Sequence, residues 1–256
     1  MCETGSVTVS AAAHLACAAA AVGAGAVNAI AGGGTLISFP VMTAVGVPSV
    51  RANATNTVSL CPGYIGGTVA QRRDLGQLGD TVKAPLVVSA AGGLVGSILL
   101  VLSSEAMFRA IVPYLIIGAC VLLAVQAPLR SWLFGRHRAE HRLVELSAIG
   151  AASVYGGYFG AGLGIMLIAV LGLFSDAPLT RVNALKQLLS IAVNVSAAAF
   201  LTFSGKVEWS LVAVMAPMSL IGGHVGGRLV SVIKPNVLRV VVVVYGLIVA
   251  TVYLLR

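Results

Sequence analysis

A stripe of polar side chains within an apolar stretch is the first candidate for chemistry. Its members follow the spacing i, i+3, i+4, i+7 and i+11, which places them on one face of an α-helix. They are Asn183, Lys186, Gln187, Ser190 and Asn194. Because such a face would be costly against lipid, we expect it to face a bundle interior or a water-filled cavity. Amide, hydroxyl and ammonium donors suit an anion, and hydrogen bonding between helices is an equally open interpretation.

A related set of polar residues occurs in the first half of the chain. Asn53, Asn56 and Thr57 align with Asn183, Lys186 and Gln187 at a constant offset of 130 residues, the separation of positions 53 and 183. Lys186 therefore occupies the place of an asparagine and is the only ionisable residue of the stripe. Its ammonium group could balance a bound anion, or it could extend towards the helix end marked by Arg181.

Glycine-rich breaks precede both polar stretches. The first contains Gly32, Gly33 and Gly34, and the second contains Gly162 and Gly164. Non-helical backbone at membrane depth persists only where protein buries it or water reaches it. A short helix that begins at such a break would direct its N–H groups and the positive end of its dipole at an anion. A tight helix crossing that needs small residues is the alternative.

Composition indicates which elements position these residues. The 256 residues are 58% hydrophobic and only 9% charged, whereas soluble domains carry roughly a quarter charged residues. Apolar runs of about 20 residues recur, each long enough to cross a bilayer as a helix, and they are continuous, which favours helices over a β-barrel. The predicted fold class is all-α: a polytopic transmembrane helical bundle of two repeated halves, each with a glycine-broken first helix pair.

The apolar pattern predicts five segments in each half. They are 7–30, 31–46, 52–71, 82–102 and 107–126, then 143–160, 162–174, 182–203, 207–229 and 236–255. We therefore expect a first transmembrane repeat over 1–127, a basic cytoplasmic linker over 128–142 and a second transmembrane repeat over 143–256. The pairs Gly92 and Gly96, and Gly222 and Gly226, are spaced as GxxxG, which favours close helix packing.

Basic residues predict how the halves are oriented. They follow the third segment of the first half as Arg72, Arg73 and Lys83, but they appear one loop later in the second half as Arg228, Lys234 and Arg239. If basic loops face the cytoplasm, the halves are inverted relative to each other. A parallel repeat with four crossings per half is the alternative.

No sequence motif indicates an enzyme, a metal site or a nucleic-acid-binding protein. There is no GxSxG, HExxH or P-loop, and the four cysteines form no CxxC pair. We therefore expect that the protein is not an enzyme, that it has no catalytic residue and that it binds no metal and no cofactor. The densest positive charge, between Arg130 and Arg142, fits a cytoplasmic loop better than a nucleic-acid surface. The expected partners are the lipid bilayer and a small anionic substrate, and a homo-oligomer is compatible with the sequence.

Three runs of residues carry a family resemblance. The sequences NAIAGGGTLISFP at 28–40, ANATN at 52–56 and GGYFGAGLG at 156–164 resemble the paired motifs of the sulfite exporter TauE/SafE-type permeases. The resemblance covers nearly the whole chain. It implies a multi-pass permease of the cell inner membrane for small sulfur-containing anions such as sulfite, sulfonates or sulfoacetate. A passive anion channel and a membrane scaffold protein without transport activity are the alternatives.

Overall fold

A computed structural model describes residues 10–30, 32–70, 82–133, 142–174, 179–229 and 235–255. Over these ranges the secondary structure consists of ten helices and no strand, which confirms the all-α class. The helices are α1 (Ala11–Ile30), α2 (Thr35–Ala44), α3 (Ser49–Ala70), α5 (Lys83–Leu102), α6 (Glu105–Leu133), α7 (Arg142–Tyr158), α8 (Leu163–Phe174), α9 (Leu179–Thr202), α10 (Trp209–Leu229) and α11 (Pro235–Leu254).

The helices follow the predicted segments closely, with one clear difference. Helix α6 continues to Leu133, into the range 128–142 that the sequence predicts as a linker. Residues 134–141 of that range lie outside the described residues, as do the loop residues Arg72, Arg73 and Lys234.

Five of the described helices are long and apolar enough to cross a membrane. They cover Ala11–Ile30, Lys83–Leu102, Glu105–Val125, Arg181–Thr202 and Trp209–Arg228. Helices α2 and α8 are much shorter, with 10 and 12 residues. At 1.5 Å per residue each extends over roughly half of a 30 Å hydrocarbon layer. Both short helices begin directly after a glycine-rich break.

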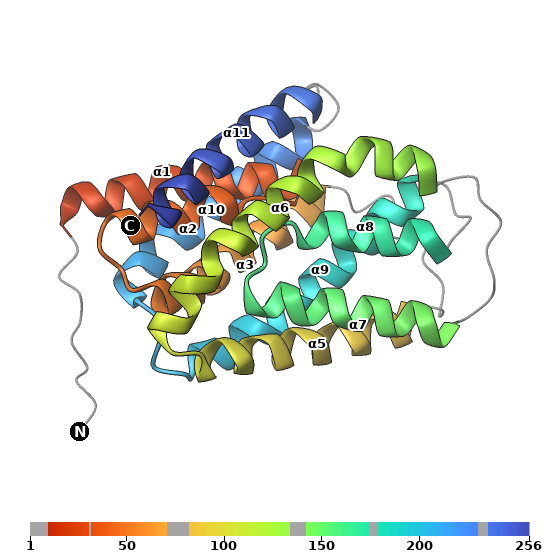
Figure 1. The fold of residues 1–256 in the computed structure, drawn as a ribbon, viewed down its shortest axis with the longest axis horizontal. Helices are drawn as coiled ribbons and strands as arrows, with labels where there is room; N and C mark the ends of the chain where they lie inside the picture. The colour runs from red at the N-terminus through yellow and green to blue at the C-terminus, as the bar shows by residue number, and fades with distance from the viewer. Residues whose placement is uncertain are drawn as a thin grey trace.

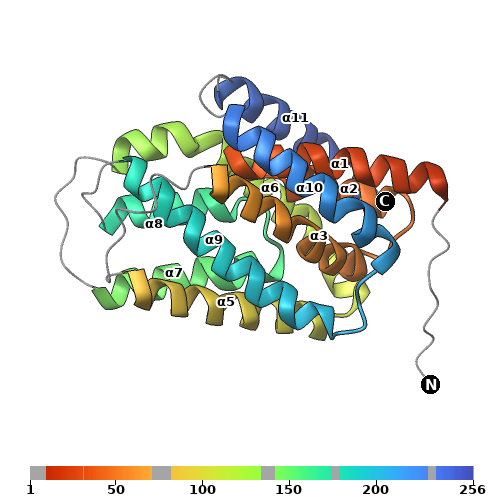
Figure 2. The same ribbon diagram turned by 180° about the vertical axis from the view of Figure 1, so that it is seen from behind.

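Long helices from one half of the chain pack against helices of the other half. Helix α1 lies along α10, and α5 lies along α7, so each first helix has a partner from the opposite half (Figure 1). The view from behind shows the same neighbours (Figure 2). Helix α3 contacts α10, α9 contacts α5, and α6 contacts α11. The two halves of the chain are therefore interleaved.

The GxxxG pairs lie at two close helix interfaces, as predicted. A Cβ added to Gly96 on α5 would lie 2.1 Å from the Val154 carbonyl oxygen of α7. A Cβ added to Gly222 on α10 would lie 2.1 Å from the Val22 carbonyl oxygen of α1. Because any side chain there would collide with main-chain atoms, these glycines determine how closely the helices approach.

Helices related by the offset of 130 residues run in opposite directions. In Figure 1, α1 runs from left to right and α7 runs from right to left. Helix α6 also starts at the left, whereas α11 ends there. The breaks between α1 and α2 and between α7 and α8 are consequently approached from opposite ends of the molecule.

Candidate functional site

The two glycine breaks are in main-chain contact with each other. Gly32 and Gly162, which the offset of 130 residues relates, have φ angles of +79° and +78°, in the left-handed region that favours glycine. The Gly162 N–H donates a hydrogen bond to the Gly32 carbonyl oxygen over 3.1 Å. A Cβ added to Gly32 would lie 3.0 Å from the Cα of Gly164. The start of α8 therefore packs against the break that precedes α2, with no room for a side chain between them.

Lys186 on α9 comes to this contact. Its Cδ lies 3.5 Å from the position that a Cβ on Gly164 would occupy, and its side chain is only 2% exposed. Within the part of the chain that the structure describes, Lys186 makes no ion pair and no hydrogen bond. Burying a cation is costly unless a charged or polar group pairs with it. The site thus holds a buried lysine beside the crossing of the two breaks.

Two asparagines of α3 bind both breaks. The Asn56 Oδ1 accepts a hydrogen bond from Ser38 Oγ at 2.5 Å, and its Nδ2 donates to Thr35 Oγ1 at 3.3 Å, so Asn56 is tied to the first turn of α2. The Asn53 Nδ2 donates to the Tyr158 carbonyl oxygen at the end of α7 over 2.7 Å. The Asn53 Oδ1 is buried and has no partner among the described residues.

Asn28 also contacts the first break, although the sequence did not single it out. Its Oδ1 accepts a hydrogen bond from the Gly34 N–H over 2.7 Å, at the start of α2. Its Nδ2 is buried and lacks a partner among the described residues. A buried polar group without a partner costs about 1–3 kcal/mol, and such groups occur at functional sites. The place of Asn28 just before a glycine break was the available signal.

Other predicted site residues make their contacts elsewhere. The Thr57 hydroxyl donates to the Asn53 carbonyl oxygen of its own helix at 3.0 Å. The Gln187 Nε2 donates to the Tyr64 carbonyl oxygen at 3.4 Å and so joins α9 to α3. A Cβ on Gly33 would make ordinary contacts with side chains of α6, α11 and α1. Asn183 is half-buried near the start of α9.

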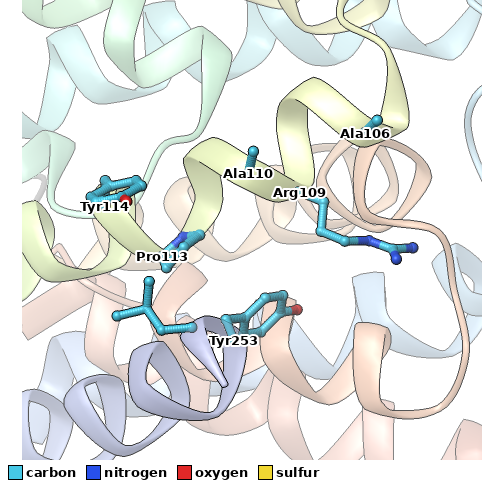
Figure 3. A pocket seen from close by; sticks show the side chains of 7 residues that line it. Ala106, Arg109, Ala110, Pro113, Tyr114 and Tyr253 are labelled. Carbon is cyan, nitrogen blue, oxygen red and sulfur yellow. The ribbon is translucent and has the colours of Figure 1, made fainter. Parts of the chain in front are cut away.

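Two cavities lie at one end of the molecule, away from the glycine breaks. The larger, of about 910 Å³, is formed by α2, α11, the start of α6 and the turn before α3. The smaller, of about 530 Å³, lies between α6 and α11 and shares Arg109 and Tyr253 with the first (Figure 3). Neither cavity is lined by a residue of the two breaks. The crossing is thus closed to both of them.

The described residues contain no group of three His, Cys, Asp or Glu side chains that could hold a metal ion. Arg51 and Glu208 form an ion pair, with their Nε and Oε1 atoms 3.1 Å apart. Arg51 stands near the start of α3, and Glu208 directly precedes α10. This pair ties α3 to α10, which is also its packing partner.

The apolar bundle and its buried polar centre define a multi-pass helical membrane protein. The model of the Sulfite exporter TauE/SafE family matches residues 17–253, and the chain belongs to this family of membrane transporters. It is 28% identical over 223 residues to the probable membrane transporter protein YfcA of Escherichia coli strain K12, covering 86% of this chain and 82% of that protein. It is 26% identical over 206 residues to the probable membrane transporter protein ORF9 of a Sinorhizobium species, with coverage of 80% and 78%. No solved structure matches the chain.

Proposed function

We propose that this protein is a secondary transporter that carries small sulfur-containing anions, such as sulfite, sulfonates or sulfoacetate, across the cell inner membrane by alternating access. The observation that carries the proposal is the position of Lys186, whose buried side chain packs on Gly164 where the two breaks touch. The nearby starts of α2 and α8 add the positive ends of two helix dipoles. A small anion is the ligand that this combination favours.

An inverted repeat with glycine-broken helix pairs is the architecture that we propose for this transporter. Binding at a midplane contact between discontinuous helices is typical of transporters with inverted repeats. The opposite directions of α1 and α7 support the inversion (Figure 1), and so does the exchange of packing partners between the halves. The matching φ angles of Gly32 and Gly162 support two equivalent breaks. In such an architecture the two halves can exchange conformations to open the site to either side.

The two half-sites differ in charge, and this difference favours a single bound anion. The Asn56 amide is hydrogen-bonded to Ser38 and Thr35. Its counterpart Lys186 makes no hydrogen bond or ion pair with the described residues. The positive charge therefore belongs to one half only, and we propose that the anion pairs with it. Asn53, with its unpartnered amide oxygen, is proposed to orient a substrate hydroxyl, a protonated oxygen or a water carried with the anion.

The test is radiolabelled sulfite uptake into proteoliposomes with Lys186→Ala and Asn53→Ala. Removing one partner of a buried charge pair costs about 2 kcal/mol or more, so Lys186→Ala should lower uptake at subsaturating sulfite at least about 30-fold. Lys206→Ala is the matched control, because Lys206 is exposed in the turn between α9 and α10. Unaltered uptake in both site variants would remove these residues from the site.

Counterflow separates this proposal from its alternatives. In a transporter, unlabelled sulfite inside the vesicle should accelerate uptake of labelled sulfite, and uptake should saturate. A passive channel would show neither behaviour. A folded protein that moves neither sulfite nor a sulfonate would instead support the scaffold alternative.

A further inference from the structure

The larger cavity is lined by an arginine of α6. Arg109 lines both cavities and is exposed, and within the described residues it makes no ion pair or hydrogen bond. Glu105, one turn earlier on α6, does not neutralise it directly. Its two carboxylate oxygens accept the Val50 N–H at 3.1 and 3.0 Å, at the start of α3. In Figure 3 the Arg109 side chain of α6 and the Tyr253 ring of α11 extend from neighbouring helices.

Arg109 is the exposed charge of this cavity, whereas the Glu105 carboxylate is partly buried and is compensated by the N-terminus of α3, so the open part of the cavity favours anions. Apart from Arg109 and Glu105, its wall consists of uncharged residues, many of them apolar, such as Val45, Val47 and Val249. A cleft with walls of low dielectric focuses the field of a charge and concentrates ions of opposite sign. A volume of about 910 Å³ far exceeds what one small anion needs, which suits a hydrated antechamber better than a binding pocket.

A packed layer of aromatic rings lies between this cavity and the glycine breaks. Tyr253 lines the cavity and stacks on Phe39, with ring centroids 6.4 Å apart. Phe39 is fully buried and meets Phe159 edge to face at 5.6 Å. Phe159 immediately precedes Gly160 of the second break. Phe108 packs on Phe39 and on Phe159, with centroids 6.3 Å apart in both cases.

Helix α2 runs from the break to the cavity, so its length between them indicates how thick this layer is. Pro40 lines the cavity, and Thr35 is bonded to Asn56 at the break. The five residue steps from Thr35 to Pro40 correspond to roughly 7–8 Å along a helix. The Tyr253 hydroxyl is hydrogen-bonded to Thr43 of α2, which fixes the outer ring over the layer.

We infer that the larger cavity is a vestibule for the transported anion, and that Phe39 with its ring partners Phe108, Phe159 and Tyr253 is the gate between this vestibule and the glycine crossing. Arg109 recruits the anion to the vestibule. Opening requires Phe39 to leave the rings of Phe159 and Tyr253, which would join the cavity to the space beside the breaks. This inference rests on the proposed transport function, but it predicts water access and charge preference that can be measured without any transport.

Cysteine labelling tests the vestibule. In a background with all four native cysteines changed to alanine, Ala44→Cys places a thiol in the cavity wall. It is treated with a negatively charged sulfonate thiosulfonate reagent and with a positively charged trimethylammonium one, and each rate is divided by the rate for a free thiol in solution. We expect the anionic reagent to be favoured about fivefold, which is the ratio that one unit charge gives in water at a distance on the order of 8 Å. Arg109→Gln should remove this preference, and 1 M salt should reduce it strongly.

A second thiol tests the gate. Ala161 is fully buried between Gly160 and Gly162, so Ala161→Cys should be protected while the rings are in place. Phe39→Ala should make it react at least about tenfold faster, and Phe39→Leu should give an intermediate rate if the alanine variant folds poorly. Leu201→Ala is the matched control, because it also removes a fully buried side chain but lies outside the ring layer. It should leave Ala161→Cys protected.

The outcomes separate this inference from the proposed function. Equal normalised rates for the two reagents at Ala44→Cys would overturn the vestibule. Equal labelling of Ala161→Cys with and without Phe39→Ala, or equal acceleration by Leu201→Ala, would overturn the gate. Neither result would touch the role of Lys186 in sulfite uptake. The expected labelling pattern in a protein that fails to transport sulfite would keep the vestibule and refute the substrate.

Discussion

Replacing Gly32 with alanine incurs two costs that the structure allows us to separate. Gly32 and Gly205 both have positive φ angles, of +79° and +69°. An alanine in this left-handed region costs about 1–2 kcal/mol at either position. At Gly205 a Cβ would meet nothing within 4 Å, whereas at Gly32 it would lie 3.0 Å from the Gly164 Cα and 3.3 Å from its nitrogen. Those are main-chain atoms that cannot rotate away, so overpacking adds about 1–3 kcal/mol there.

Thermal unfolding in detergent measures this difference. For a chain of this size, 1 kcal/mol corresponds to about 2–4 °C in Tm. Gly205→Ala should therefore lower Tm by about 2–8 °C, and Gly32→Ala by about 4–20 °C at the same scan rate. Sulfite uptake should persist in Gly205→Ala and be lost in Gly32→Ala, because the two breaks can no longer touch. Equal Tm values and equal uptake for the two variants would refute the contact between the breaks.

Two further substitutions test how the site is held. Asn28→Ala should lower the free energy of unfolding by about 0.5–2 kcal/mol, because the Gly34 N–H loses its acceptor. Thr57→Val is the control and should be nearly neutral in the same thermal assay, because the Thr57 hydroxyl bonds within its own helix. Equal shifts in the two variants would contradict this expectation. Glu208→Gln should lower the free energy of unfolding by about 1–3 kcal/mol, which is less than for a fully buried pair because the Arg51 side chain is 23% exposed. This loss should become smaller in 1 M salt. An unchanged Tm at low salt would show that the ion pair does not stabilise the fold.

The sequence predicted the helices well, because their signals are local. Apolar runs bounded by glycine, proline or charged residues locate α1, α5 and α10 without any knowledge of their neighbours. The end of α6 was less predictable. Its sequence turns polar after residue 125, yet the helix continues to Leu133, since a helix that leaves the apolar layer has no reason to unwind there. Hydropathy reports the surroundings of a helix and not the hydrogen bonds that end it.

The packing partners of the helices could not be predicted, because a GxxxG spacing does not indicate which helix packs against it. The pattern showed that α5 and α10 would each approach another backbone closely. It did not show that α10 would contact α1 and α5 would contact α7, which is the exchange that interleaves the two halves. That choice depends on which faces remain available after every helix is placed, and no short motif records it.

The repeat pointed to residues that do meet at the breaks, but not to what each of them contacts. Lys186, Gly164 and Gly32 do come together, as a repeat with two meeting breaks would require. Gln187 and Thr57 belong to the same stripes but direct their hydrogen bonds elsewhere. Helical periodicity identifies a shared face, yet Lys186 lies at the crossing while its neighbour Gln187 bonds to the main chain of α3. Asn28 was missed for the complementary reason, since a single asparagine at the end of an apolar helix shows no periodicity.

The hydrogen bonds at the breaks indicate why binding and gating belong to one event in the proposed mechanism. The amide of Gly34 is held by Asn28, and the amide of Gly162 is held by the Gly32 carbonyl. These two N–H groups, which could otherwise receive an anion, are therefore already satisfied while the rings around Phe39 are closed. An anion can use them only if the breaks part, and parting the breaks leaves Lys186 without the packing of Gly164 against its stem. The free energy of binding and the free energy of opening are then linked through the same few atoms, so a ligand that cannot pair with Lys186 would have no means of opening the site.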